Sequence, residues 1–313
     1  MRTSKLISLI VSFILLGCSS SPPTPTSVNL RKNMAADNLK YGNNAYDQGD
    51  YTKALQFFLL ALEHNTAADY EEGLIKSYHS LSKTFLALGQ LEKARSMLES
   101  ARRILQFYAD NGLKAQQQYH QANLLLEEGK FDQAFQTMTE ALTLNQNTTD
   151  QAQRAVILHG MGMVKRGRAI STNNNELLTE ALKDFQAAQK INESLPSNVE
   201  LATNHYMQGM VYLRLNVLDQ ARFHLQTALE LDRKMEISFG IAMDHRALGM
   251  LATKENNWNV AADHYLRSYR IFLVLSLPEQ QKRALDLLIE ALTKANKKEE
   301  AEIFKQERSR LDA

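Results

Sequence analysis

Side chains that could do covalent or metal chemistry are few in this sequence, and they do not cluster. Cys18 is the single cysteine, so the chain can form neither an intramolecular disulfide nor a cysteine-cluster metal site. The eight histidines are scattered, and Asp244–His245 and Asp263–His264 are isolated pairs. The sequence contains no glycine-rich phosphate loop, His-Glu-x-x-His pair or nucleophile-elbow serine. We therefore expect a protein that is not an enzyme and that holds no metal or cofactor.

Residues suited to binding a partner recur instead at helical spacing in the C-terminal half. They are Met161, Lys165, Tyr206, Met210, Arg214, Arg246, Met250 and Lys254. Each methionine lies four residues before a cation, which places both side chains on one face of a helix. Methionine adapts to several apolar partners, and a row of cations attracts acidic groups. The pattern predicts a groove that binds an acidic, amphipathic protein segment. In the alternative, the methionines fill the core and the cations form a solvated face.

The elements that would carry these side chains repeat along the chain. An alanine recurs at intervals of 40, 40, 47, 40, 40 and 40 residues, and small and bulky apolar residues keep the same register around it. The predicted packing positions are Gly42, Ala54, Ala61, Ala94, Ala101, Ala134, Ala141, Gly160, Ala181, Ala188, Gly209, Ala221, Ala228, Gly249 and Ala261. Small residues let two helix backbones approach closely while bulky residues fill the adjoining gaps. The pattern therefore predicts stacked pairs of packed helices.

These columns resemble the tetratricopeptide repeat, a helix-turn-helix unit of about 34 residues. The longer period is similar to a long-helix variant of that family. The resemblance implies an all-α fold, a right-handed α-solenoid of about seven helical hairpins behind a lipoprotein signal peptide. We expect six repeats over residues 34–278 and a degenerate seventh repeat over residues 279–313. Lys298, Lys305 and Arg308 make that last hairpin polar, as suits a cap with no further neighbour.

The same resemblance implies that the first helix of each repeat lines the concave surface. Projection of one helix face then assigns three residues of each repeat to that surface. Besides the C-terminal residues named above, they are Leu39, Asn43, Asp47, His79, Lys83, Ala87, Tyr119, Asn123, Glu127, Ile157, Asp286, Glu290 and Lys294.

The interval of 47 residues falls in the fourth repeat. Its first helix is predicted to end near Gly167, and residues 168–180 form an insertion rich in turn-forming residues. This alignment also places Gly160 only 26 residues after Ala134, where the other repeats have 28. The insertion is either a tolerated surface loop or a contact for a partner.

The N-terminal residues have the layout of a targeting signal. Arg2 and Lys5 precede an apolar run over residues 6–16, which is too short to cross a bilayer of about 30 Å as a helix. The run ends in Leu15-Leu16-Gly17-Cys18, which resembles the lipobox of bacterial lipoproteins. In the alternative, the segment is an ordinary signal peptide and the cysteine is incidental.

The lipobox resemblance implies a signal peptide over residues 1–17 and a covalent lipid on Cys18. A Pro/Ser/Thr-rich tether would follow, over residues 18–33. Ser19 implies, by the same resemblance, a lipid-anchored position in the inner leaflet of the outer membrane, facing the periplasm.

Charge argues against one class of partner. Lys plus Arg number 36 and Asp plus Glu number 35, so the chain has no overall attraction for nucleic acid. The first function hypothesis is therefore an outer-membrane lipoprotein that acts as a protein–protein adaptor or assembly factor for envelope proteins. The second is a regulatory protein that senses a peptide or another ligand.

Overall fold

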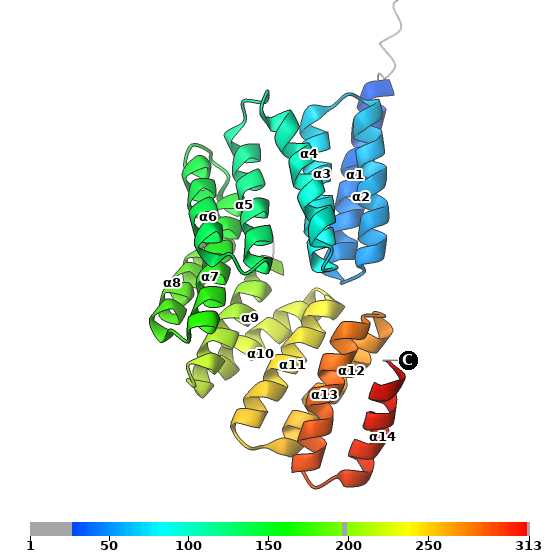
Figure 1. Cartoon of the computed structure of the whole chain (residues 1–313), viewed down its shortest axis with the longest axis vertical. Helices are drawn as coiled ribbons and strands as arrows, with labels where there is room; N and C mark the ends of the chain where they lie inside the picture. Colours follow the sequence, from blue (N-terminus) through cyan, green and yellow to red (C-terminus); the bar gives the residue numbers. More distant parts are fainter. Residues whose placement is uncertain (1–26, 196–198, 312–313) are drawn as a thin grey trace, which may run out of the picture.

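The protein folds into stacked α-helices (Figure 1). The computed structural model describes residues 27–195 and 199–311. Within these residues the helices are α1 (Ser27–Asp47), α2 (Tyr51–Ala67), α3 (Glu71–Ala87), α4 (Leu91–Leu105), α5 (Asn111–Glu127), α6 (Phe131–Asn145), α7 (Gln151–Thr172), α8 (Asn175–Asn192), α9 (Val199–Arg214), α10 (Leu218–Lys234), α11 (Ser238–Lys254), α12 (Trp258–Val274), α13 (Pro278–Lys294) and α14 (Lys298–Arg310). Consecutive helices pair as seven hairpins, α1–α2 to α13–α14, which we number as repeats 1 to 7.

Helix length and turn chemistry together set the spacing of the repeats. Helices of 17 residues, such as α2 and α3, are separated by three-residue connections, and this combination gives the 40-residue spacing of the alanines. The connection within a repeat needs a left-handed residue. Repeats 1 to 3 use Gly49, Gly89 and Gly129 there, whereas later repeats use asparagines such as Asn216 and Asn256. Glycine and asparagine adopt this conformation at the least cost.

The alanines that recur along the sequence, which we call the alanine ladder, lie where the stacked helices touch. Its seven alanines, from Ala54 to Ala301, are at most 2% exposed, and the second small column is equally buried. The upstream glycines explain why small residues are required. A Cβ on Gly42 would lie 2.4 Å from Cε1 of Phe58, and one on Gly249 would lie 2.5 Å from Cε1 of Tyr265. The hairpins close only because these backbones carry no side chain.

Repeat 4 corrects the predicted register. Gly162, and not Gly160, faces the bulky residue of its own hairpin, since a Cβ on Gly162 would lie 2.7 Å from Cε1 of Phe185. Gly160 faces Met138 of the preceding repeat. Gly162 follows Ala134 by the usual 28 residues, so the whole seven-residue excess lies between Gly162 on α7 and Ala181 on α8.

The predicted insertion is helical over most of its length. Helix α7 continues past Gly167 to Thr172, and α8 begins at Asn175, so only a two-residue turn separates them. Asn173 is left-handed at φ 49°, and the Asn174 side chain caps α8 by accepting the N–H groups of residues 176 and 177. The excess therefore lengthens a hairpin and does not form a long loop.

The two ends of the stack differ. Helix α1 begins at Ser27, so residues 27–33, predicted as tether, are helical; the last proline before them is Pro25, and nothing after it interrupts a helix. Leu30, Met34 and Tyr41 on α1 are more than 40% exposed, since no other repeat among the described residues covers this side of α1. Repeat 7 ends in the polar α14, whose Arg308 pairs with Asp286 at 2.9 Å. Residues 1–26, including Cys18, lie outside the described residues.

Candidate binding site on the concave face

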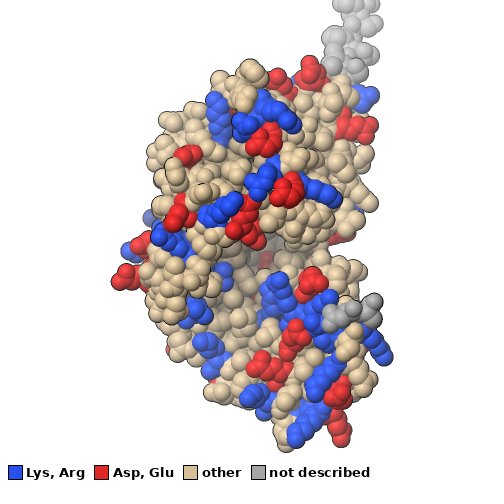
Figure 2. Space-filling view, viewed as in Figure 1, with Lys and Arg blue, Asp and Glu red and all other residues tan. Residues whose placement is uncertain are grey.

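The stack curves, so that repeats 1 to 3 and repeats 5 to 7 form two arms facing each other across a hollow (Figures 1 and 2). The hollow has a volume of about 850 Å³. Its walls come mainly from α1, α3, α5, α7 and α9, the first helices of repeats 1 to 5, with Asp150 before α7 and Asn192 of α8. The residues that line it are Asn43, Tyr46, Asp47, Lys83, Leu86, Ala87, Gln116, Tyr119, His120, Asn123, Leu126, Glu127, Asp150, Ala152, Gln153, Ala155, Val156, Ile157, His159, Asn192, Val199, Glu200, Thr203 and Asn204.

A ladder of polar side chains at 40-residue spacing crosses this hollow. Asn43, Lys83 and Asn123 come from successive first helices, as the projection of the helix faces predicted. The Lys83 ammonium donates to Oδ1 of Asn43 at 3.2 Å and lies 4.1 Å from the centre of the Tyr46 ring. An ammonium carries three donors, so Lys83 can still bind a ligand through the others.

Carboxylates surround this lysine. Asp47 follows Asn43 by one turn of α1, Glu127 follows Asn123 on α5, and Glu200 approaches from α9. Burial raises the pKa of the Asp47 carboxyl, Lys83 lowers it, and Glu200 raises it. Burial lowers the pKa of the Lys83 ammonium, against the attraction of Asp47 and Glu200. The hollow thus joins residues at least 150 positions apart, from α1 and α9, in one electrostatic unit.

Three histidines in and behind the wall are held neutral. Burial lowers the pKa of His79 to about 4, and it also lowers the pKa values of His120 and His159. Nδ1 of His159 lies 2.7 Å from Oδ1 of Asn204, while Nδ2 of Asn204 is buried without a hydrogen-bond partner. These rings and amides add uncharged polar groups to a hollow that also carries Asp47, Lys83 and Glu200.

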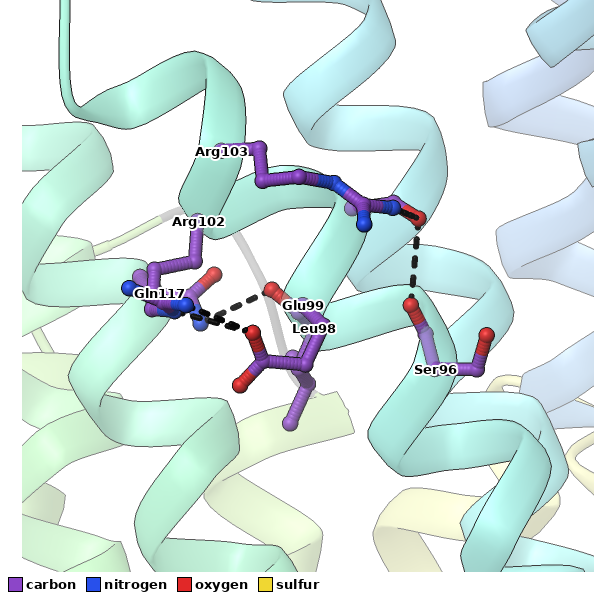
Figure 3. Close-up of polar contacts among 7 residues, drawn as sticks. Ser96, Leu98, Glu99, Arg102, Arg103 and Gln117 are labelled. Carbon is purple, nitrogen blue, oxygen red and sulfur yellow. Dashed lines mark hydrogen bonds and ion pairs between the residues drawn. The ribbon is translucent and has the colours of Figure 1, made fainter.

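A second layer fixes the proton on His79. Nε2 of Gln117 donates to the carbonyl of Leu98 at 3.2 Å, a contact drawn in Figure 3. The opposite atom, Oε1 of Gln117, therefore accepts from Nε2 of His79 at 2.8 Å. This arrangement favours the His79 tautomer with the proton on Nε2, and Nδ1 has no hydrogen-bond partner among the described residues. The same amide ties α3, α4 and α5 together behind the hollow.

The residues predicted as a groove in the C-terminal half do not line the hollow. Met161 packs against the core of repeat 3, and the Lys165 ammonium pairs with Asp184 of α8 at 2.8 Å. Both placements follow from the two-residue register error in repeat 4. Burial raises the pKa of Asp184, and Lys165 opposes this rise.

The remaining predicted residues pack mainly against neighbouring repeats. Met210 and Tyr206 pack on the core of repeats 5 and 6, and Met250 also contacts that of repeats 6 and 7. Arg246 donates to Oε1 of Gln280 at 2.7 Å, and Arg214 donates to Oδ1 of Asn173 at 3.2 Å. Lys254 is exposed. The structure therefore brings the methionines into packing contacts and spreads the cations.

The C-terminal half buries titratable pairs instead. Asp232 and Asp244 meet at the junction of repeats 5 and 6, where burial raises the pKa values of both carboxyl groups. Asp232 raises the pKa of Asp244 further, whereas the interaction with Asp244 opposes the rise at Asp232. The corresponding junctions use neutral groups, as in the hydrogen bond from Asn65 to Ser77 at 3.1 Å. At neutral pH the pair retains a proton on Asp244, because two buried like charges cannot both ionise cheaply.

The described residues contain no group of three metal-ligating side chains, and none of their helices is long and apolar enough to cross a membrane. Sequence reasoning missed His159, Asn204 and Glu200 as lining residues. His159 was missed because of the register error in repeat 4. Asn204 and Glu200 lie on α9, and the curvature that brings α9 close to α1 cannot be predicted from a local sequence pattern.

Comparison with known proteins assigns the repeats. Residues 34–106 match one family model described as tetratricopeptide repeat, and residues 116–148 and 202–235 match another of the same description. The chain contains tetratricopeptide repeats. No curated protein matches the sequence.

Solved structures share the tetratricopeptide solenoid at low identity. A Rap protein complexed with Competence and Sporulation Factor is 14% identical with a TM-score of 0.67, over 89% of this chain and 75% of that one. A signal-transduction ATPase with a tetratricopeptide repeat sensor, from Pyrococcus horikoshii, is 15% identical with a TM-score of 0.63, over 85% and 46%. BtubC from P. vanneervenii is 18% identical with a TM-score of 0.57, over 78% and 91%. Identities this low establish the fold alone.

Proposed function

We propose that this protein binds an extended peptide segment of a partner in the hollow and so acts as a protein–protein interaction module of the cell envelope. The observation that carries the proposal is the polar ladder of Asn43, Lys83 and Asn123, with unused donors on Lys83 and Asn204. Peptide backbones offer carbonyl oxygens at regular intervals, and side-chain amides and an ammonium suit them. The Rap protein of similar fold is complexed with Competence and Sporulation Factor, which supports a role in binding a partner.

The charges of the hollow indicate which peptides fit. Asp47, Glu127 and Glu200 outnumber Lys83, so a segment carrying a basic side chain or a free amino group is favoured there. The acidic, amphipathic segment expected from the methionines and cations remains a prediction for the C-terminal half.

Capture of partners from an envelope extract tests the proposal. Lys83→Ala removes the ladder donor without adding a carboxylate to the hollow and should weaken capture of proteins that the unaltered protein retains. Lys254→Ala makes the same change on an exposed side chain outside the hollow and should leave their capture intact. Equal loss in both variants, or in neither, would refute the hollow as the site.

The proposal includes a location in the cell, the outer membrane. Lipid on Cys18 would anchor the protein to the outer membrane, since two or more acyl chains make anchoring effectively permanent. Cys18→Ser should abolish fatty-acid labelling and release the protein from membranes. A variant that loses the label and stays fully membrane-bound would refute the anchor.

A sensor of a peptide or small ligand is the second candidate, favoured by the volume of the hollow, about 850 Å³. Stable co-purification with a defined assembly supports the adaptor. A ligand-dependent rise in melting temperature without any stable protein partner supports the sensor.

A further inference from the structure

The two arms of the superhelix touch each other. In a solenoid each repeat contacts its neighbours only. Here the turn between α1 and α2 also reaches the turn between α10 and α11. Nε2 of Gln48 donates to the carbonyl of Glu236 at 2.9 Å, and the N–H of Ser238 donates to Oε1 of Gln48 at 3.1 Å. These partners lie 188 and 190 residues apart in sequence.

Apolar contacts reinforce this junction. The Tyr51 and Phe239 rings meet edge to face with centroids 6.1 Å apart, and Phe239 in turn meets Phe272 at 6.0 Å. Gly49 provides the room, since a Cβ there would lie 2.9 Å from Cδ2 of Phe239. Phe239 thereby links the first repeat to the core of the sixth.

The junction is specific to the first turn. Gln48 satisfies both polar groups that the α10–α11 turn presents: the carbonyl of Glu236 and the N–H of Ser238, the first residue of α11. The residues at the same place in repeats 3 and 6, Glu128 and Glu255, instead bind Arg95 and Arg222 of adjacent repeats. The Gln48 side chain is therefore matched to a turn across the superhelix.

We infer that this junction, formed by Gln48, Gly49 and Tyr51 against Glu236, Ser238 and Phe239, is a latch that holds the two arms closed around the hollow. Asn43, Tyr46 and Asp47 line the hollow on the same helix that ends at the latch. Release of the latch lets α1 move away from α9 and widens the entrance to the hollow. Two hydrogen bonds and one ring contact favour the closed form by about a hundredfold, so the open form is thermally accessible.

The chain offers a matched pair of variants. Gly49→Ala and Gly89→Ala impose the same left-handed strain, at φ 81° and 70°, but only Gly49 has an atom of another residue within 4 Å of the added Cβ. Gln48→Ala and Leu88→Ala form a second pair, since both positions precede these glycines and only Gln48 belongs to the latch.

Two readouts report the latch directly in the full chain. Hydrogen exchange of the Ser238 amide should be about fivefold faster in Gln48→Ala, through loss of its acceptor, and unchanged in Leu88→Ala. Spin labels at Thr52→Cys and Asn259→Cys, with Cys18→Ser, should report longer distances between the arms in Gly49→Ala than in Gly89→Ala. Circular dichroism verifies that each variant remains helical. Unchanged exchange and distances in both latch variants would overturn the latch.

Partner capture separates the latch from the proposed function. With the Lys83-dependent partner, release should be faster from Gln48→Ala than from Leu88→Ala, and an equal rate would overturn the gating role. If the unaltered protein captures no partner, the proposed function fails, while exchange and distance still decide whether the arms are latched.

Discussion

Repeats 1 to 3 and repeats 5 and 6 are built on one alanine ladder, yet their concave faces differ. Asn43, Lys83 and Asn123 in the first group leave a polar hollow, whereas Met210 and Met250 in the second pack against neighbouring cores. The repeat fixes where the helices lie, and the size and polarity of a few inner side chains decide whether the space between them stays open. Scaffold and site are therefore separable properties of this chain.

The largest expected effect tests whether the scaffold is the same in both halves. Ala54→Leu and Ala221→Leu each force a larger side chain into a fully buried position, which should lower the free energy of unfolding by about 3 kcal/mol in both cases. Chemical denaturation measures the loss. Phe223→Ala, on a side chain 59% exposed, should change it by less than about 0.5 kcal/mol. A much smaller loss at one alanine would show that the two halves are packed differently.

The next effect concerns the carboxyl pair that only the C-terminal half buries. Because the folded pKa values of Asp232 and Asp244 are raised, the native state holds protons that the unfolded state releases, and stability falls as pH rises through those values. Asp232→Asn should raise the free energy of unfolding at pH 8 by about 2 kcal/mol and flatten this decline.

The reverse substitution, asparagine to aspartate, should introduce the same pH dependence of stability into the N-terminal half. Asn65→Asp places a carboxyl where Asn65 now donates to Ser77, and it should introduce a loss of stability with rising pH. Thermal melts of both variants between pH 5 and pH 9 are the measurement. Parallel pH profiles for Asp232→Asn and the unaltered protein would refute the role of this pair in the pH dependence of stability.

The smallest effect tests the turns. Gly89→Ala should cost about 1 kcal/mol, because alanine resists φ 70° and the added Cβ meets no other atom within 4 Å. Gly89→Asn should cost less than half of that, since Asn256 serves at φ 58° in the later repeats. Equal costs in chemical denaturation would mean that strain is not what distinguishes the two kinds of turn.

The fold could be predicted because its signal is periodic. Small residues at 40-residue intervals specify where helices touch, and the buried ladder from Ala54 to Ala301 follows that pattern. Repeat 4 was misaligned because Gly160 and Gly162 both lie on α7 and both face bulky side chains, one across each side of the helix. Sequence spacing alone does not distinguish these two contacts.

The site was predicted only in part. Asn43, Lys83 and Asn123 lie on the concave face as expected, because the helix register in repeats 1 to 3 has no insertion. The roles of Glu200 and Gln48 depend on how far the superhelix turns. That curvature sums small rotations over several repeats, so it leaves no local mark in the sequence.

The Gln48 junction also affects the order in which the repeats unfold. A linear array frays from both ends, since each terminal repeat has a single neighbour. Repeat 1 has a second attachment, whereas among the described residues repeat 7 packs against repeat 6 and has no such cross-arm contact. Partial unfolding should therefore begin at α14 and move toward the centre, so that proteases first shorten the protein from its carboxyl end.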